Sequence, residues 1–268
     1  MDKSEFTGTA FRAAMLAGEH ILSNLGKILQ SDIDTKQTSD FVTRVDRESE
    51  RIIIDTIKQK FPDHKFLAEE SVSKDYSGEF RWIIDPLDGT TNFIHGYPVF
   101  SVSIALEVKS EVVLGLVYDP LRHEIFTAEK GKGAFLNGRP VRVSSVPDLG
   151  NSLVTTGFPF RRKDLIGPYL DLFRNIFFRV SDIRRAGSAA LDLASLASGR
   201  CDCFFEIGLS PWDIAAGSIL IKEAGGIVTD FGGGNDYMLT GNIVAATPSL
   251  HKEILKEVRG VFAGTIDK

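Results

Sequence analysis

Two aspartates share one short turn in the stretch RWIIDPLDGTTNF, residues 81–93. Asp85 and Asp88 follow an apolar run and are separated only by Pro86 and Leu87. Carboxylates this close repel each other, so the pair needs a cation, a shared proton or full solvation. Pro86 fixes its own φ, which lets the turn aim both aspartates and the Leu87 carbonyl inward. The pattern predicts a site for two divalent ions about 4 Å apart.

Four more acids stand where predicted strands end or predicted helices begin. Each has a purely structural alternative, because two of them fit N-terminal capping boxes and the other two could lie in a solvated loop. Strands that end at one sheet edge would nevertheless bring Glu69 close to Asp85, and ligand sites favour such edges. Oxygen donors at this density, without His or Cys, select Mg²⁺ or Mn²⁺ over zinc. The four acids are Asp46, Glu69, Glu70 and Asp213.

The residues after Asp88 suit an anion. Gly89 and Thr90 are expected to open a short helix, whose free N–H groups and positive dipole end bind phosphate. The alternative is an Asp-Gly turn with no ligand. The sequence contains neither G-x-x-x-x-G-K-[ST] nor G-x-S-x-G, so an activated water is the expected nucleophile.

The composition excludes several classes of protein. The chain has 268 residues, of which 43% are hydrophobic and 25% charged, with a formal net charge of −5. This balance is ordinary for a soluble globular protein and argues against nucleic-acid binding through a broad basic field. No signal peptide or long apolar run is present, so we expect a cytoplasmic protein without membrane contact. Cys201 and Cys203 are predicted to be packing thiols on the same face of a strand.

The first half of the chain reads as α+β. Apolar spacing predicts amphipathic helices over about residues 4–30 and 43–60. Short strands with tight turns follow, which indicates an antiparallel meander. These strands are expected in 81–85, 99–108, 111–119, 123–130 and 131–141. We expect this half, residues 1–145, to carry most of the metal ligands.

The second half alternates strands and helices and is predicted to be α/β. We expect residues 146–268 to complete the site at a cleft, with both halves in one compact unit. Strands are predicted at 152–157, 178–184, 202–206, 226–229 and 242–246, and helices at 164–177, 187–199, 211–224 and 248–259.

Two long segments resemble the signatures of the inositol monophosphatase family, within the lithium-sensitive, magnesium-dependent sugar phosphatase superfamily. They are WIIDPLDGTTNFIHGYP and WDIAAGSILIKEAGGIVTD, and DFVTRVDRESE, FLAEES and GSAALDLASLASGRCDCFFE agree in order and spacing. The resemblance implies a layered αβαβα sandwich and a homodimer. It also implies a Mg²⁺-dependent phosphomonoesterase that hydrolyses myo-inositol 1-phosphate, or a similar small sugar phosphate, with metal-activated water.

The resemblance also implies roles for individual residues. It makes Glu69, Asp85, the Leu87 carbonyl, Asp88 and Asp213 metal ligands, with Glu70 in support. It makes Thr90 and Asp46 the pair that activates water, with Glu69 as a further catalytic acid. Phosphate would bind the amides of Gly89 and Thr90. Substrate contacts are implied for Ser188, Ala189, Glu206 and Asp213, and Lys36 would stand at the mouth of the site. His95 is needed as a ligand in none of these roles and is expected to cap or pack in its loop.

One segment, TGFPFRRKD, departs from the animal enzymes and is closer to bacterial and archaeal members. Its Phe158, Phe160, Arg161 and Arg162 could line the leaving-group side. The two arginines could also bind a second phosphate or form a solvated surface pair. Fructose-1,6-bisphosphatase and nucleotide 3′-phosphatase activities therefore stay open. A mainly RNA- or transcription-associated interaction protein is the alternative outside enzymology, although the net charge does not indicate it.

Overall fold

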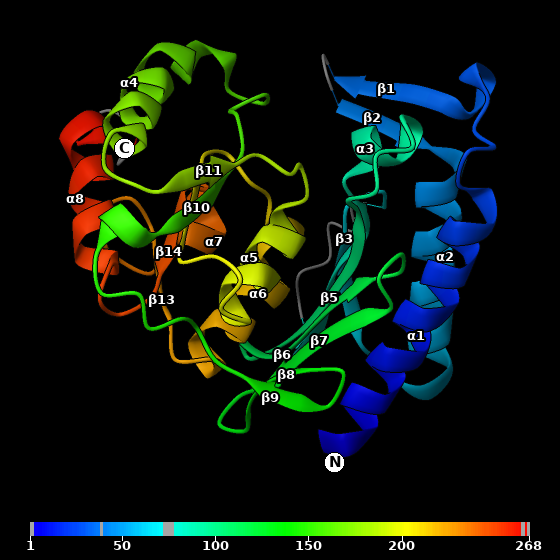
Figure 1. Cartoon of the computed structure of the whole chain (residues 1–268). Coiled ribbons are helices and arrows are strands. Elements are labelled where there is room, and N and C mark those ends of the chain that lie inside the picture. Colours follow the sequence, from blue (N-terminus) through cyan, green and yellow to red (C-terminus); the bar gives the residue numbers. More distant parts are fainter. Residues whose placement is uncertain (1–2, 38–39, 72–77, 264–265, 267–268) are drawn as a thin grey trace.

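The computed structural model describes residues 3–37, 40–71, 78–263 and 266. Five layers follow one another across the molecule (Figure 1). A seven-stranded and a five-stranded sheet enclose an inner pair of helices, and each sheet carries another helix pair on its outer face. The chain therefore has the predicted αβαβα sandwich. From the seven-stranded side, the pairs are α1 (Lys3–Asn24) with α2 (Arg44–Lys60), α5 (Ala189–Ala197) with α6 (Pro211–Glu223), and α4 (Ile166–Phe177) with α8 (His251–Phe262).

The N-terminal helix is shorter than predicted. The expected helix over 4–30 ends at Asn24, because Gly26 adopts a left-handed φ of 73° that stops the helix. A 3₁₀ turn (Gln30–Asp32) and an antiparallel pair follow, β1 (Ile33–Gln37) with β2 (Asp40–Thr43). Neither strand was predicted. Lys36 lies in β1, but its side chain is outside the described residues.

The seven-stranded sheet contains the predicted meander. From β4 to β9 each strand pairs antiparallel with the next, and β3 is added parallel to β4. The β4–β5 register is interrupted between Asp85 and Asp88, so the segment between them leaves the regular ladder. The strands are β3 (Lys65–Ala68), β4 (Phe80–Asp88), β5 (Ser101–Val108), β6 (Glu111–Asp119), β7 (Glu124–Glu129), β8 (Gly133–Leu136) and β9 (Arg139–Val141).

The five-stranded sheet belongs to the second half and has the order β11-β10-β12-β14-β13. The strand predicted over 178–184 covers only Asp182–Arg184, because the Phe178 N–H continues the helical hydrogen bonding to Arg174. The other strands are β10 (Leu153–Thr156), β12 (Cys203–Glu206), β13 (Ile227–Thr229) and β14 (Ile243–Ala246). The short helices are α3 (Thr90–Ile94), α7 (Tyr237–Thr240) and two 3₁₀ turns (Leu149–Asn151 and Lys163–Leu165).

Both faces of the seven-stranded sheet are buried. Alternate side chains of β4 point to opposite sides, so Ile83 packs with the inner helices and Ile84 with the outer cluster around α1 and α2. The inner cluster draws residues from both halves, for example Ile83 and Phe204. A third cluster fills the space between the five-stranded sheet and its outer helices. The boundary predicted near residue 145 stays a prediction.

The prediction for the two cysteines is wrong in one respect. Both are buried and free, but Cys201 packs in the inner cluster while Cys203 packs in the outer cluster beneath α4 and α8. They face opposite ways because side chains alternate only within a strand, and β12 begins at Cys203. His95 is the C-cap residue of α3, and its side chain is exposed.

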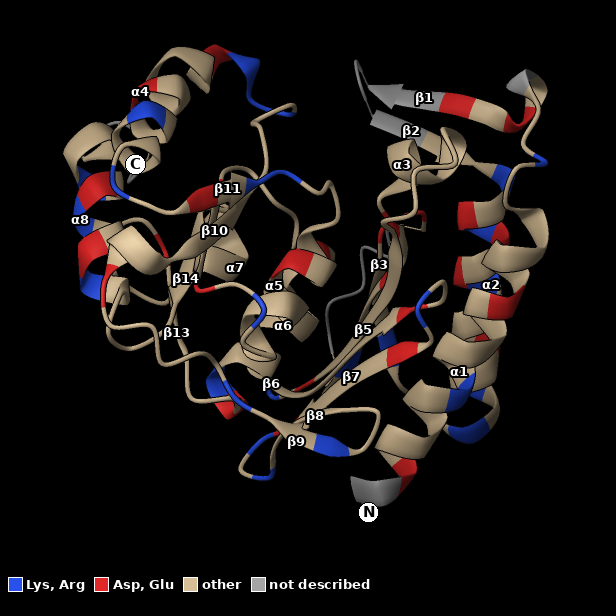
Figure 2. Ribbon diagram, in the orientation of Figure 1, with Lys and Arg blue, Asp and Glu red and all other residues tan. Residues whose placement is uncertain are grey.

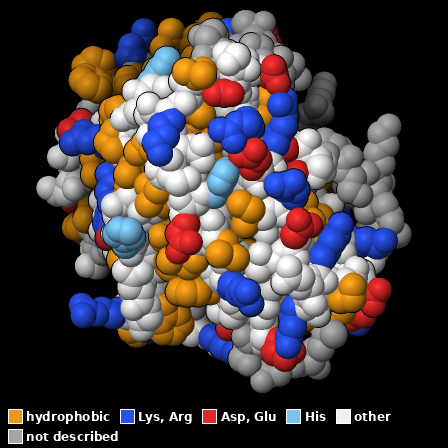
Figure 3. All heavy atoms as spheres, turned by 90° about the vertical axis from the view of Figure 1, so that its right-hand side faces the viewer, with side chains coloured by type: hydrophobic (Ala, Val, Ile, Leu, Met, Phe, Trp, Pro, Cys, Tyr) orange, Lys and Arg blue, Asp and Glu red, His pale blue; other side chains and the backbone are white. Residues whose placement is uncertain are grey.

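The outer surface is mixed in charge. Acidic and basic residues are interspersed along the ribbon (Figure 2), and on the α1–α2 side their side chains stand among apolar ones (Figure 3). Many of them pair, as Arg44 does with Glu48 and Lys60 with Glu5. Among the described helices, none combines the length and the apolar character needed to cross a bilayer.

A buried histidine links α2 to the sheet. The His64 ring stacks between Phe61 and Phe80, with centroid distances of 4.7 and 4.6 Å. Its Nδ1 accepts a hydrogen bond from Trp82 Nε1 over 3.0 Å, so the ring proton must lie on Nε2. Within the described residues Nε2 has no hydrogen-bond partner. Burial lowers the pKa of His64, although Asp63 opposes this shift.

Acid should therefore destabilise the fold through His64. Because the folded-state pKa lies below the ordinary value of 6.5, the unfolded chain takes up the proton first as the pH falls. The free energy of unfolding should decrease from about pH 7 to pH 5, and His64 should contribute at most ~1.4 kcal/mol per pH unit. Urea titrations should show a shallower acid loss in His64→Phe, with a variant of the exposed His95 as the control. Identical pH dependence in His64→Phe and the wild type would contradict this.

Candidate active site

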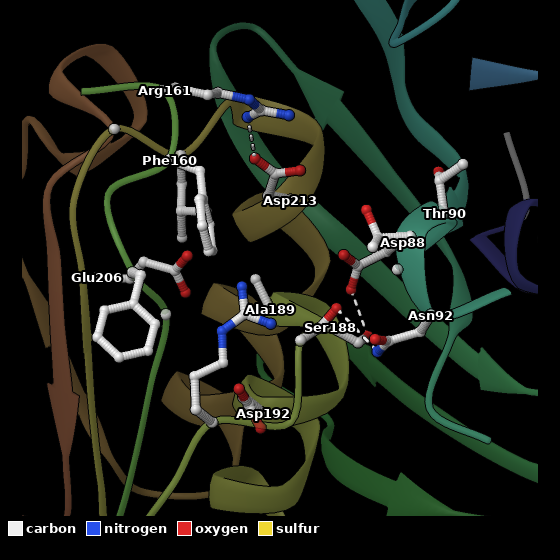
Figure 4. Close-up of a pocket in the computed structure, with 18 of the residues that line it drawn as sticks. Asp88, Thr90, Asn92, Phe160, Arg161, Ser188, Ala189, Asp192, Glu206 and Asp213 are labelled. Carbon is white, nitrogen blue, oxygen red and sulfur yellow. Dashed lines mark hydrogen bonds and ion pairs between the residues drawn. The ribbon is translucent and has the colours of Figure 1, made fainter. Parts of the chain in front are cut away.

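A cavity of about 590 Å³ gathers nearly all of the residues singled out in the sequence. It opens where β3, β4, β10 and β12 end and where α3, α5 and α6 begin (Figure 4). The predicted residues that line it are Glu69, Asp85, Leu87, Asp88, Gly89, Thr90, Ser188, Ala189, Glu206 and Asp213. Asp46 is not in the lining but bonds to Thr90. The lining therefore draws residues from both the first and the second part of the chain.

Three buried aspartates form the centre of this cavity. Asp85, Asp88 and Asp213 each offer a carboxylate oxygen within 4.8 Å of the others, and their exposed fractions are 2%, 9% and 5%. Burial raises the pKa of Asp85 well above its ordinary value, and Glu69, Asp88 and Asp213 raise it further. Burial, followed by repulsion from Asp213, raises the pKa of Asp88 to about 7. A set of buried oxygen donors that repel one another fits a hard divalent cation.

Strand pairing brings Glu69 to this centre. Ala68 pairs with Ile84 in the parallel β3–β4 ladder, and the Glu69 N–H donates to the Ile84 carbonyl over 3.2 Å. The next residue of each strand is therefore an acid at the same sheet edge. This confirms the expected closeness of Glu69 and Asp85.

Asp88 joins the two halves of the chain. Its Oδ2 accepts hydrogen bonds from the Ser188 hydroxyl over 2.5 Å and from the Ala190 N–H over 2.8 Å, at the first turn of α5. Ser188 is also the N-cap of α5 and is almost fully buried. Its hydroxyl proton is therefore directed at Asp88, and the substrate contact expected for Ser188 stays a prediction.

Asp213 and Asp46 serve the helices that carry them as well as the cavity. Asp213 Oδ2 accepts the Ser210 N–H over 2.6 Å in a capping box that begins α6. In the same way, Asp46 Oδ2 accepts the Thr43 N–H and hydroxyl at the start of α2. Both acids therefore have the capping role that was the structural alternative. The same hydrogen bonds fix their side chains at the site.

The second oxygen of Asp46 reaches the cavity wall. Asp46 Oδ1 lies 2.7 Å from Thr90 Oγ1, which is also 3.1 Å from the Leu87 carbonyl oxygen. Burial raises the pKa of Asp46, and its hydrogen bonds from Thr43 and Thr90 oppose this shift. The predicted Thr90–Asp46 pair is thus in contact.

Gly89 must be glycine for two reasons. Its φ is 98°, and a Cβ there would lie 2.9 Å from the Val99 carbonyl oxygen. The short helix α3 begins directly after it, as predicted, and the Phe93 N–H donates to the Gly89 carbonyl.

The wall opposite the acids contains two residues that the sequence did not single out. Arg185 lies 5.2 Å over the ring of Phe160, and Asp192 is a buried residue of the same cavity (Figure 4). Burial raises the pKa of Asp192 and of Glu206 well above ordinary values, and Arg185 partly offsets both shifts. A side chain at Gly157 would collide with the Glu206 carboxylate. No pattern in the sequence indicates that the Arg185 side chain lines the cavity.

The two arginines of TGFPFRRKD do not act as a pair. Arg162 turns outward and forms an ion pair with the exposed Asp164 over 2.8 Å. Arg161 turns into the cavity, where Nη1 donates to Asp213 Oδ2 over 3.0 Å. The alternative of a solvated surface position therefore applies to Arg162 but not to Arg161.

Glu50 is a further residue that the sequence reasoning missed. It is 3% exposed, and its Oε2 accepts the Glu70 N–H over 2.7 Å, directly after Glu69. A signal was available, because Glu50 follows Asp46 by one helical turn and shares the buried face of α2 with Ile53 and Ile57. An acid on that face needs a partner.

Comparisons with known proteins agree over almost the whole chain. A model of the inositol monophosphatase family matches residues 2–262. The Nus factor SuhB of Escherichia coli strain K12 is 49% identical over 260 residues, which cover 97% of both chains. Extragenic suppressor protein suhB of Bartonella henselae is 42% identical, with a TM-score of 0.88 over 94% of this chain and 98% of its own. An inositol monophosphatase of Anabaena is 38% identical, with a TM-score of 0.86 over 97% and 98%.

Glu50 should support cation binding without touching the cation. Glu50→Leu removes the acceptor that holds the Glu70 amide, whereas Glu50→Gln keeps one. Mn²⁺ affinity measured by calorimetry should fall about 10-fold or more in the leucine variant. The glutamine variant should stay close to the wild type. Equal affinities for both variants would show that the contact does not position the loop.

Proposed function

This chain belongs to the inositol monophosphatase family, and we propose that it is a Mg²⁺-dependent phosphomonoesterase acting on myo-inositol 1-phosphate or a similar small sugar phosphate. The observation that carries the proposal is the buried group of Asp85, Asp88 and Asp213. It lies in one cavity with Thr90, whose hydroxyl is hydrogen-bonded to Asp46 behind the cavity lining.

The metal ligands would be the acids at the cavity centre. Glu69, Asp85, Asp88 and Asp213, with the Leu87 carbonyl, would hold Mg²⁺, and Mn²⁺ would also suit these oxygen donors. When bound, the ion would supply positive charge that polarises the phosphoryl group and lowers the pKa of a water molecule.

Thr90 and Asp46 would remove the proton from that water. The Thr90 hydroxyl proton points to Asp46 Oδ1 when Asp46 is ionised, so the lone pairs of the threonine oxygen can accept a proton. Thr90 would then pass its own proton to Asp46. Because burial raises the pKa of Asp46, the carboxylate is a stronger base than an exposed aspartate.

The remaining cavity residues would hold the substrate. The Gly89 and Thr90 amides would bind the phosphate. Ser188 would keep Asp88 oriented through the hydrogen bond that it donates. On the leaving-group side, Ala189 would contact the ring and Glu206 would accept hydrogen bonds from polyol hydroxyls.

The direct test is phosphate release from a panel of inositol, fructose and nucleotide phosphates, with and without Mg²⁺. We expect inositol 1-phosphate to be hydrolysed only with Mg²⁺. Asp88→Asn should lower kcat by roughly 100-fold or more, because it removes a charge at the reaction centre. Undiminished Mg²⁺-dependent turnover in this variant would refute the ligand assignment. Preference for fructose 1,6-bisphosphate or a nucleotide 3′-phosphate would move the substrate assignment to the alternatives named above.

The threonine pair gives a separate prediction. Thr90→Val keeps the shape of the side chain but removes the hydroxyl, so kcat should fall by roughly 100-fold or more. Thr90→Ser keeps the hydroxyl and should retain most of the activity. The ratio of the two kcat values is the decisive number, and a ratio near one would exclude Thr90 from proton transfer.

A second role comes from the relatives named Nus factor. We propose that this chain also associates with the transcription machinery, independently of catalysis. Purified RNA polymerase should retain the wild type and Asp88→Asn equally if the roles are separate. Absence of binding by both proteins would remove this role.

A cytoplasmic location and a homodimer are further proposals, and light scattering of the purified chain tests the dimer.

A further inference from the structure

Arg161 places a positive charge among the proposed metal ligands. Its Nη1 donates to Asp213 Oδ2 over 3.0 Å and to Ser210 Oγ over 3.1 Å. Its Nη2 lies 3.9 Å from Glu69 Oε1. Figure 4 shows the guanidinium at the rim of the cavity, directed at Asp213. One side chain thus contacts a proposed metal ligand from each half of the chain.

Asp213 does not need Arg161 for its orientation. The same oxygen accepts the Ser210 N–H over 2.6 Å, and Asp213 is the third residue of a buried helix that begins with Pro211. Its other oxygen, Oδ1, accepts no hydrogen bond within the described part of the chain. Arg161 therefore contributes a positive charge beside Asp213 but is not needed to orient the Asp213 side chain.

Arg162 shows that the loop does not force its arginines inward. It pairs with Asp164 at the surface, where both side chains are more than half exposed (52% and 61%). The Arg161 side chain is 37% exposed, whereas the Asp213 side chain beside it is 7% exposed. Arg161 therefore differs from Arg162 in that it pairs with an acid of the cavity. Arg162 provides a matched control because it pairs with an acid at the surface.

We propose that Arg161 competes with the divalent cation for Glu69 and Asp213, and that its guanidinium withdraws when the cation binds. The inference rests on the proposed metal site. A guanidinium keeps its charge at every accessible pH, so it cannot relieve repulsion by losing a proton. At separations of a few ångströms that repulsion is only weakly screened by salt. The partly exposed loop gives the side chain room to turn to water. Arg161 thereby weakens cation binding and neutralises the acids when the cation is scarce.

The test measures Mn²⁺ binding to the full chain by calorimetry and electron paramagnetic resonance. Arg161→Gln should bind Mn²⁺ about tenfold more tightly than the wild type, because a repelling charge is removed. Arg161→Lys, which keeps the charge, should stay near the wild type. Arg162→Gln should differ by less than about twofold, because an exposed ion pair contributes little. In the absence of Mn²⁺, Arg161→Gln should also have a lower Tm than Arg162→Gln, and saturating Mn²⁺ should remove this difference.

The outcomes separate this inference from the proposed function. If the wild type binds Mn²⁺ and Arg161→Gln binds it equally or more weakly, the proposed competition is wrong and the proposed metal site stands. Failure of the wild type to bind Mn²⁺ overturns both. A measurement on the wild type covers the case in which the glutamine variant does not fold: the Arg161 Nε–H NMR signal, assigned by its loss in Arg161→Lys, should move on addition of Mg²⁺. A signal that stays in place while Mg²⁺ binds also overturns the inference.

Discussion

Three carboxylates buried within a few ångströms of one another are the constraint on which this structure depends. Asp85, Asp88 and Asp213 have lost most of their contact with water and repel each other. Such a cluster is tolerable only if protons or cations neutralise it. Asp85 and Asp88 come from β4 and Asp213 comes from α6, so packing of the inner helices against the seven-stranded sheet brings these acids together. The same contact region contains the Asp88–Ser188 hydrogen bond.

The site is rigid because its residues also have structural tasks. Asp46 and Asp213 complete the capping boxes of α2 and α6, and Gly89 is fixed by a left-handed backbone and a close carbonyl. A side chain held by its own helix start loses little freedom when it binds a ligand. The opposite wall is built differently, with Arg185 stacked on the partly exposed Phe160.

Much of this arrangement could be predicted because it follows local rules. Strand alternation and short turns predicted the meander, and two strands ending in acids predicted that Glu69 lies close to Asp85. Helix starts were placed well at Thr43 and Ser210, whereas the end of α1 was not, because the left-handed Gly26 outweighs the apolar spacing that continues to Leu29. Sequence alone could not show whether Asp46 caps α2 or serves the site, because its carboxylate does both. One oxygen accepts the Thr43 N–H, and the other accepts the hydrogen bond from Thr90.

What the sequence could not predict depends on tertiary packing. The opposite directions of Arg161 and Arg162 follow from which acids lie within reach once the two halves meet. Cys201 and Cys203 diverge because a bend precedes β12, which a periodic pattern cannot reveal. Glu50 was detectable as an acid on an apolar helix face, but its partner, the Glu70 amide, is known only from the fold.

Anomalous diffraction from crystals grown with Mn²⁺ would show whether divalent cations neutralise the buried acids. We expect anomalous peaks within about 2.2 Å of carboxylate oxygens of Asp85, Asp88 and Asp213. Crystals that show full protein density but no anomalous peak at these oxygens, at Mn²⁺ concentrations that saturate binding in solution, would contradict this expectation.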